Sequence, residues 1–230
     1  MSDQTRWLRR RGTQLPHSSD ATAVDPDVIA RERLEQYHAN FPERSVRIGQ
    51  QMKTLLASSG VSTGRILEIG GRATPYREWF PDFEYVGLDL VNDDDAEDRD
   101  PDLIAGDITS CPQLESGSFD AVVSVNVLQH VRKPWLAAPE IIRLLRPGGF
   151  TYHSTVFSWR YHPSPVDFWR FTPDALMSLF DDLRVMRSEF DTIERRRNLI
   201  GKGKYRSEPD AFGGWRENWR VFYAGVKHEA

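Results

Sequence analysis

Two acidic side chains and one amide stand at the ends of three successive apolar runs in this sequence. Asp89, Asp107 and Asn126 occupy these positions, and His130 follows the last run. A carboxylate can accept hydrogen bonds from both hydroxyls of a ribose, which suits Asp89, and a second can accept from the exocyclic amine of an adenine, which suits Asp107. The carboxyl ends of parallel strands lie at one edge of a sheet. We therefore predict a nucleoside-binding site at that edge.

A glycine turn precedes these acids. The apolar run Arg65–Ile69 contains Glu68 and leads directly into Gly70 and Gly71. Glycine lets a ligand approach the bare backbone. A single acid after a strand is often only a helix cap or a turn former. Two such acids after successive strands, with a glycine turn before them, favour a bound nucleoside.

The segment 156–176 combines aromatic and polar side chains, and its prolines predict a stiff loop rather than a helix. Its candidate polar residues are His162, Asp167 and Arg170, which stand with Arg160 beside the aromatic residues Trp159, Tyr161, Phe168, Trp169 and Phe171. Aromatic groups beside planar polar groups suit a sugar ring, which stacks and also forms hydrogen bonds. The aromatic residues can instead plug the sheet, as we expect of Trp169 and Phe171. For the three polar residues, catalysis or binding and a structural pairing both stay open.

Two histidines outside this loop have different expected roles. His130 follows the fourth apolar run, where it can act as a general base or only cap and pack. His153 lies inside the fifth run and is predicted to be a core histidine with satisfied hydrogen bonds.

These residues need elements that position them, and the sequence predicts strands alternating with helices. The expected strands cover 65–69, 85–90, 102–108, 119–128, 149–157, 183–190 and 219–226, and the expected helices include 135–145 and 174–180. Thr172 and Pro173 are a favourable N-cap and first residue for the second of these helices. The pattern predicts an α/β fold with a doubly wound, mostly parallel seven-stranded sheet.

The N-terminal part differs in character from this core. Residues 1–26 are predicted to be a flexible tail that carries the basic arm Arg6–Gly12, and 27–62 a helical extension of the domain 63–230. A helix is expected over Glu43–Ser59, because its apolar residues recur at helical spacing. The acidic run Asn92–Asp100 and the segment 195–215 are expected to be surface loops.

Composition limits the partners. The net charge is −4 over 230 residues, which argues against general nucleic-acid binding. Cys111 is the only cysteine, so no intrachain disulfide and no cysteine metal cluster are expected. We expect no metal, no membrane span and a cytoplasmic location. The sequence does not indicate the oligomeric state.

The ordered series LEIGG, VGLDL, GDIT, FDAVVSVNVLQHV and LLRPGGF resembles the motifs of class I S-adenosylmethionine-dependent methyltransferases, of the type 11 kind. The resemblance implies a Rossmann-like methyltransferase fold and S-adenosyl-L-methionine as cofactor. It also implies cofactor-binding roles, with the methionine moiety near Glu68, Gly70 and Gly71, the ribose near Asp89 and Leu90, the adenine near Asp107 and Ile108, and the sulfonium near Asn126.

The chain departs from the family in the glycine turn. The family pattern implies glycines at positions 72 and 74, where this chain has Arg72 and Thr74. S-adenosylmethionine has no pyrophosphate and does not need the tight anion cradle of a dinucleotide, so a wider turn is compatible with it. Arg72 and Tyr76 could approach the carboxylate of the cofactor.

The expected reaction is O-methylation of a small molecule or a saccharide, with the acceptor held by the loop 156–176. This loop is similar to a P-x-D-[FY]-W-R-[FY]-T stretch in some methyltransferases of glycan or surface-polymer assembly. Two alternatives stay open. One is an NAD(P)-dependent oxidoreductase, and the other is a catalytically silent module that binds S-adenosylmethionine.

Overall fold

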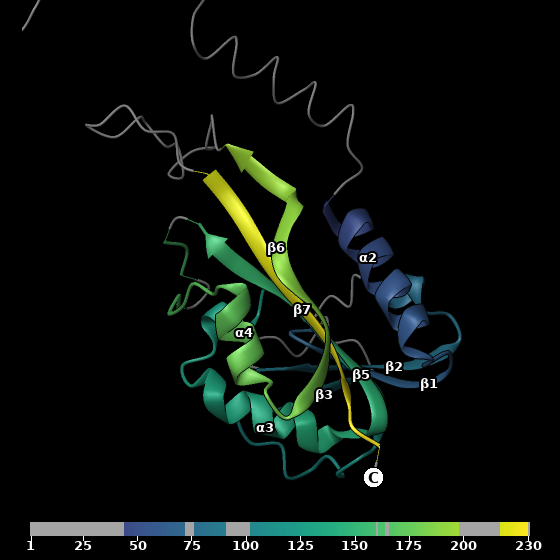
Figure 1. Ribbon diagram of the computed structural model, residues 1–230. Coiled ribbons are helices and arrows are strands. Elements are labelled where there is room, and N and C mark those ends of the chain that lie inside the picture. The colour runs from purple at the N-terminus through teal and green to yellow at the C-terminus, as the bar shows by residue number, and fades with distance from the viewer. Residues whose placement is uncertain are drawn as a thin grey trace, which may run out of the picture.

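The computed structural model describes residues 44–71, 76–90, 102–159, 161–163, 166–197 and 217–229 (Figure 1). Several predicted features lie outside these residues. They are the tail 1–26, the part 27–43 of the helical extension, the acidic run 92–100, Arg72 and Thr74. The helices are α2 (Arg44–Ser59), η1 (Arg77–Trp79), η3 (Leu128–His130), α3 (Pro134–Leu144) and α4 (Pro173–Leu179). The strands are β1 (Gly64–Ile69), β2 (Phe83–Asp89), β3 (Leu103–Ala105), β4 (Phe119–Val125), β5 (Leu145–Ser158), β6 (Leu183–Arg197) and β7 (Glu217–Lys227).

The seven strands form one sheet in the order β3-β2-β1-β4-β5-β7-β6. Strands β1 to β5 pair in parallel, and β7 is antiparallel to both of its neighbours, β5 and β6. This arrangement confirms the prediction of a mostly parallel seven-stranded α/β sheet. It also differs from the order 3-2-1-4-5-6 of dinucleotide-binding sheets, in which no strand is inserted before the last one.

Helices cover both faces of the sheet, with α2 on one face and α3 and α4 on the other (Figure 1). Neighbouring residues of a strand point to opposite faces, so Ile66 joins the core under α2 and Leu67 joins the core under α3 and α4. The apolar stripe expected of α2 is buried there and consists of Ile48, Met52, Leu55 and Leu56. The predicted helix and its buried face are therefore confirmed.

The ends of several elements differ from the prediction. α3 ends at Leu144, and β5 begins at Leu145 rather than at Gly149. The Pro-Gly-Gly segment lies within the first part of β5, where Gly148 has φ +71° and the β4–β5 register shifts. At the other end of the sheet, β6 continues to Arg197 because it pairs with β7 as far as Glu217. Residues 195–197 of the predicted surface loop therefore belong to β6, and 198–215 lie outside the described residues.

The predicted N-terminus of α4 is confirmed. The hydroxyl of Thr172 accepts a hydrogen bond from the amide of Ala175, at 3.1 Å, and Pro173 is the first helical residue. None of the helices within the described residues is long and apolar enough to cross a membrane.

Candidate functional site

The glycine turn after β1 folds tightly against β2. The amides of Gly70 and Gly71 both donate to the carbonyl of Leu88, at 2.8 and 3.4 Å, and Gly70 has φ +76°. A Cβ atom at Gly71 would lie 2.7 Å from the carbonyl oxygen of Glu68 and 3.0 Å from the Cα of Gly87. Both glycines are therefore required by the backbone path of the turn itself.

Glu68 lies beneath this turn and is almost fully buried. The hydroxyl of Tyr85 donates to its carboxyl group, at 2.7 Å. Burial raises the pKa of Glu68 to about 7, against the opposing effects of the Tyr85 hydrogen bond and the Arg77 charge. Glu68 thus lies inside the fold next to the turn, and its contact with a cofactor stays a prediction.

The two acids predicted to hold a nucleoside lie at the ends of neighbouring strands, Asp89 as the last residue of β2 and Asp107 two residues after β3. Asp89 ends β2 and pairs with Ala105 of β3, and the amide of Gly106 donates to its carbonyl, at 3.0 Å. Asp107 follows on the exposed surface. Its Oδ1 accepts hydrogen bonds from the amide and the hydroxyl of Thr109, both at 2.8 Å. Both bonds use the same oxygen, which leaves Oδ2 as the oxygen available to a ligand.

The residues next to these acids lie in different environments. The side chain of Leu90 is 58% exposed beside Asp89, whereas Ile108 is 4% exposed and belongs to the core under α3 and α4. Of this pair, only the Leu90 side chain offers an exposed apolar surface next to the acids.

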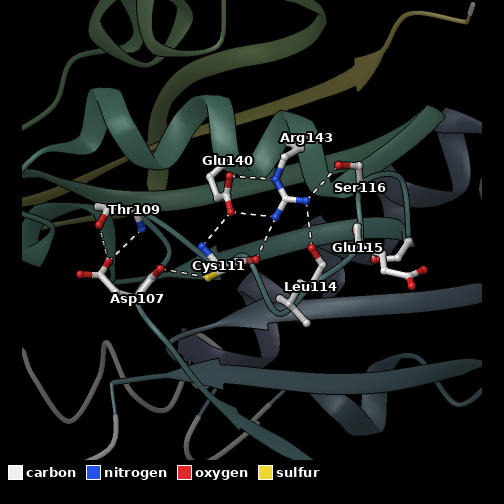
Figure 2. A network of polar contacts seen from close by, with 9 residues as sticks. Asp107, Thr109, Cys111, Leu114, Glu115, Ser116, Glu140 and Arg143 are labelled. Atoms are coloured by element: carbon white, nitrogen blue, oxygen red, sulfur yellow. Dashed lines mark hydrogen bonds and ion pairs between the residues drawn. The ribbon is translucent and has the colours of Figure 1, made fainter.

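A polar network holds the segment that carries Asp107 against α3 (Figure 2). The carboxylate of Glu140 accepts from the amide of Cys111, at 2.7 Å, and from Arg143. Arg143 also donates to the carbonyls of Cys111 and Leu114, both at 2.9 Å. The hydrogen bond and the charge of Arg143 lower the pKa of Glu140 against the effect of burial. This clamp was not predicted from the sequence, because Glu140 and Arg143 are 29 and 32 residues away from Cys111 in the chain.

At the end of β4, Asn126 adopts a left-handed conformation with φ +61°. Its amide donates to the carbonyl of Ser154 on β5, at 2.9 Å, and its side-chain oxygen accepts a short hydrogen bond from Arg220 of β7. Arg220 also donates to the hydroxyl of Ser154, at 2.9 Å. Asn126 is therefore fixed both by its backbone and by its side chain.

Arg220, which holds the side chain of Asn126, was not predicted from the sequence. It is fully buried, and it pairs in the β6–β7 register with Asp191, which is also buried. A buried charge is costly unless an opposite charge and hydrogen bonds compensate it. An arginine inside the apolar run of the last strand was the available sequence signal.

In the loop 156–176, the polar residues form one cluster around Asp167. The side chain of Asp167 is 1% exposed and accepts two hydrogen bonds from Arg170, at 2.6 and 2.8 Å. It also accepts from the amide of His162, at 2.8 Å, and lies 3.1 Å from Nδ1 of the same residue. Burial raises the pKa of Asp167, but these partners outweigh it and lower the pKa to about 2. Asp167 is therefore ionised at neutral pH.

His130 lies next to this cluster. Its Nδ1 donates to the carbonyl of Val166, at 2.5 Å, because a carbonyl can only accept. The rings of His130 and His162 meet edge to face, with their centroids 5.1 Å apart. The structure thus brings together the four residues that the sequence suggested for catalysis, His130, His162, Asp167 and Arg170.

Backbone hydrogen bonds attach the loop to the end of β4. The carbonyl of Gln129 accepts from the amides of Phe168 and Trp169, at 2.9 and 3.2 Å, and the indole of Trp169 donates to Val131. Trp169 and Phe171 pack against the core under α3 and α4, which confirms the hydrophobic plug expected of them.

His153 is confirmed as a core histidine. Its ring nitrogens bond to the hydroxyls of Ser124 and Thr151, at 2.8 and 2.7 Å, and its ring stacks on Phe180. Burial lowers the pKa of His153 to about 3, so the ring is neutral. It lies in the core and contributes to packing.

The site therefore has two halves with different chemistry. Near β2 and β3, the carboxylates of Asp89 and Asp107 can accept hydrogen bonds from hydroxyls and amines. This acceptor set fits a nucleoside, and two carboxylates disfavour a pyrophosphate. Near β4 and the loop 156–176, imidazole groups beside an ionised carboxylate can hold or move a proton.

Comparison with known proteins finds a methyltransferase family over the middle part of the chain. A family model described as "Methyltransferase domain" matches residues 59–153, which include the glycine turn and end before the loop 156–176. A curated relative, an uncharacterized methyltransferase of Mycolicibacterium gilvum (strain PYR-GCK), is 32% identical over 106 residues, which cover 40% of this chain and 40% of the relative. The matched region of this chain thus spans less than half of that relative's length.

Solved structures share the fold at low identity. A candidate methyltransferase from Bacillus halodurans C-125 has a TM-score of 0.55 and 12% identity, over 76% of this chain and 97% of that chain. Phosphoethanolamine N-methyltransferase 2 of Haemonchus contortus has a TM-score of 0.53 and 17% identity, over 78% of this chain and 53% of that chain. The cyclase SpnF has a TM-score of 0.56 and 14% identity, over 79% of this chain and 81% of that chain. The shared fold therefore hosts more than one reaction.

Proposed function

We propose that the protein is a class I S-adenosylmethionine-dependent methyltransferase that methylates a hydroxyl oxygen of a small molecule or a saccharide. The observation that carries the proposal is the pairing of His162 with the buried carboxylate of Asp167, next to the end of β4. A hydroxyl acceptor carries a proton that must leave, whereas an acceptor without such a proton needs no base.

The cofactor half of the site fits S-adenosylmethionine. Asp89 accepts from the ribose hydroxyls, and the Oδ2 atom of Asp107 accepts from the adenine amine. The exposed side chain of Leu90 offers an apolar contact beside the ribose. When bound, the cofactor supplies an electrophilic methyl group on a sulfonium, and Asn126 borders that group.

The acceptor half is suited to proton removal. The carboxylate of Asp167 holds the proton of His162 on Nδ1, so Nε2 carries the lone pair that accepts the acceptor's proton. Arg170 keeps Asp167 ionised and in place through two hydrogen bonds. His130 is held in the same tautomer by the carbonyl of Val166 and orients the acceptor next to the His162 ring. These contacts favour a catalytic role for the cluster beyond a structural pairing.

The aromatic side chains of the loop suit a ring-shaped acceptor. Tyr161, which precedes His162 in the chain, and Phe168 are both exposed, at 70% and 39%. An aromatic face can stack on the apolar face of a sugar or on another planar ring, while hydroxyl groups reach the imidazoles.

The test is the substitution Asp167→Asn, measured by S-adenosylhomocysteine formation over a panel of saccharides and phenols. Asn keeps the shape but no longer holds His162 in the required tautomer or charge. We expect turnover to fall roughly 100- to 10,000-fold, the usual contribution of a general base. Affinity for S-adenosylhomocysteine should stay within about twofold, because the cluster lies on the acceptor side.

The matched control is His228→Gln, which removes an exposed histidine at the end of the chain and should leave both quantities unchanged. Equal loss of cofactor affinity in the Asp167 variant would make the loop structural. Absence of any S-adenosylhomocysteine formation by the unmodified protein, despite cofactor binding, would favour a silent binding module.

A further inference from the structure

Exposed apolar side chains gather in one region of the described surface. Seven large hydrophobic residues of the described chain are exposed, and five of them lie in two short segments. We call this region the aromatic patch, and its members are Trp135, Leu136, Tyr161, Val166 and Phe168. Contiguous exposed apolar surface in a folded protein marks an interaction site.

The two segments of the aromatic patch are joined by direct contacts. Trp135, at the start of α3, meets the ring of Trp169 edge to face, with the centroids 5.8 Å apart. The guanidinium of Arg132 lies over the ring of Phe168, at 5.9 Å from its centroid. The patch is therefore one surface, and it adjoins the pair His130 and His162.

The charge of this surface is positive. Arg132 and Lys133 are exposed and directly precede α3. Asp167 is the only carboxylate within the segments 129–136 and 161–170, and it is buried against Arg170. The chain as a whole has a net charge of −4, so these two segments are opposite in sign to the chain as a whole.

We propose that the aromatic patch docks the protein on an anionic lipid bilayer and so presents the loop 156–176 to acceptors at the membrane surface. Tryptophan, phenylalanine and leucine side chains enter the boundary between headgroups and acyl chains, while arginine and lysine contact anionic headgroups. Aromatic groups next to cations match that boundary in both polarity and charge.

A second copy of the chain fits this surface less well. In a two-fold dimer the same patch meets itself, so Arg132 and Lys133 of both copies would approach their own counterparts. Like charges brought together in an interface oppose association. The anionic bilayer supplies the opposite charge instead.

The inference about the class of acceptor rests on the proposed function, whereas docking of the protein on the bilayer does not depend on it. A bilayer bound at the aromatic patch lies next to His162, so the acceptor class is an amphiphile whose hydroxylated headgroup projects from the membrane. Binding of the protein to lipid requires neither cofactor nor acceptor, and it can therefore be tested independently.

The experiment is cosedimentation of the full chain with vesicles, without cofactor. Vesicles of phosphatidylcholine containing about one third phosphatidylglycerol should bind the protein at least tenfold more tightly than pure phosphatidylcholine vesicles, because each basic residue near an anionic surface contributes. High salt should abolish binding of the unmodified protein. Equal affinity for both vesicles, or no binding, would overturn the proposal.

Paired substitutions locate the surface. Arg132→Gln with Lys133→Gln should weaken binding roughly 10- to 30-fold, and Trp135→Ser with Leu136→Ser should also weaken it at least severalfold. The matched control is Arg184→Gln with Val185→Ser, an exposed cation and an exposed hydrophobic residue of β6, which should leave affinity unchanged. An equal loss in the control overturns the assignment. The assignment is also overturned if the protein forms a concentration-dependent dimer that the Trp135 and Leu136 substitutions dissociate.

Discussion

The carboxyl group of Glu68 is buried under the glycine turn and bonded to the hydroxyl of Tyr85 at 2.7 Å. Its pKa in the folded protein is about 7, above the ordinary value of 4.5, mainly because of burial. The folded state therefore holds this proton more tightly than the unfolded state does. The resulting stability is present below pH 4.5 and is lost as the pH rises through about 7.

The substitution Glu68→Gln should remove this pH dependence, because the amide does not titrate and can still accept from Tyr85. As the pH rises from 4.5 to above 7, the free energy of unfolding of the unmodified protein should fall by up to about 3 kcal/mol relative to that of the variant. Urea unfolding at several pH values measures this difference. Glu84→Gln, at an exposed carboxylate of β2, serves as the control. Parallel stability curves for Glu68→Gln and the unmodified protein would contradict the raised pKa.

Arg220 orients Asn126 at the end of β4, so its substitution should affect turnover as well as stability. Lysine retains the charge but not the planar fork that reaches both Asn126 and Ser154. We expect Arg220→Lys to lower kcat by roughly 10- to 100-fold, as a small displacement at the reacting centre does. Steady-state kinetics would test this, with Asn126→Ala as a comparison that should resemble it. Unchanged kcat in a folded Arg220→Lys variant would contradict the positioning role.

Among the elements, α3 has a role that reaches beyond packing. Glu140 and Arg143 bind the backbone of the segment after β3, and this segment carries Asp107 (Figure 2). The clamp therefore links a helix on one face of the sheet to the part of the site where we propose that adenine binds.

Breaking this clamp should weaken cofactor binding without any contact to the cofactor. Arg143→Ala removes hydrogen bonds to Glu140, Cys111 and Leu114, and should lower the free energy of unfolding by about 1–3 kcal/mol. Affinity for S-adenosylhomocysteine should fall severalfold, because Asp107 is less well held. Calorimetric titration measures the affinity, and Arg146→Ala provides a control, since Arg146 pairs with Asp120 elsewhere. If Arg143→Ala binds S-adenosylhomocysteine as tightly as Arg146→Ala does, the clamp does not support the cofactor site.

The sequence predicted the elements whose signals are local. The stripe of α2, the cap at Thr172 and the acids at the ends of β2 and β3 all depend on neighbouring residues or short periods. The start of β5 at Leu145 was not predicted, because the proline and glycines at 147–149 are typical of a turn between a helix and a strand. The position of β7 between β5 and β6, antiparallel to both, was not predicted either, because no local pattern encodes the order or the direction of a strand in the sheet.

Residues that act across the sheet could not be assigned from the sequence. Arg220 and Asn126 are 94 residues apart, and the antiparallel path of β7 alone brings them together. Arg143 and Cys111 are 32 residues apart and meet through the packing of α3. The histidine pair was suggested from the sequence, but its contact depends on backbone hydrogen bonds between the loop and Gln129.

At the scale of the whole molecule, the strand order accounts for the position of the site. β1 has β2 on one side and β4 on the other, so the chain reverses its direction of progress across the sheet at this point. Ligands of open α/β sheets bind at such a switch point, outside the carboxyl ends of the strands. Asp89 and Asp107 lie on one side of it, and Asn126 lies on the other side with the histidine pair.

The most direct test of the account is calorimetric titration of the unmodified protein and an Asp89→Ala variant with S-adenosylhomocysteine. We expect the unmodified protein to bind, and the variant to lose about 1.5–3 kcal/mol of binding free energy, because a carboxylate that accepts from the ribose is removed. The variant should retain its thermal stability. An unchanged dissociation constant in Asp89→Ala, or binding of NAD(P) in place of S-adenosylhomocysteine by the unmodified protein, would contradict the proposed cofactor site.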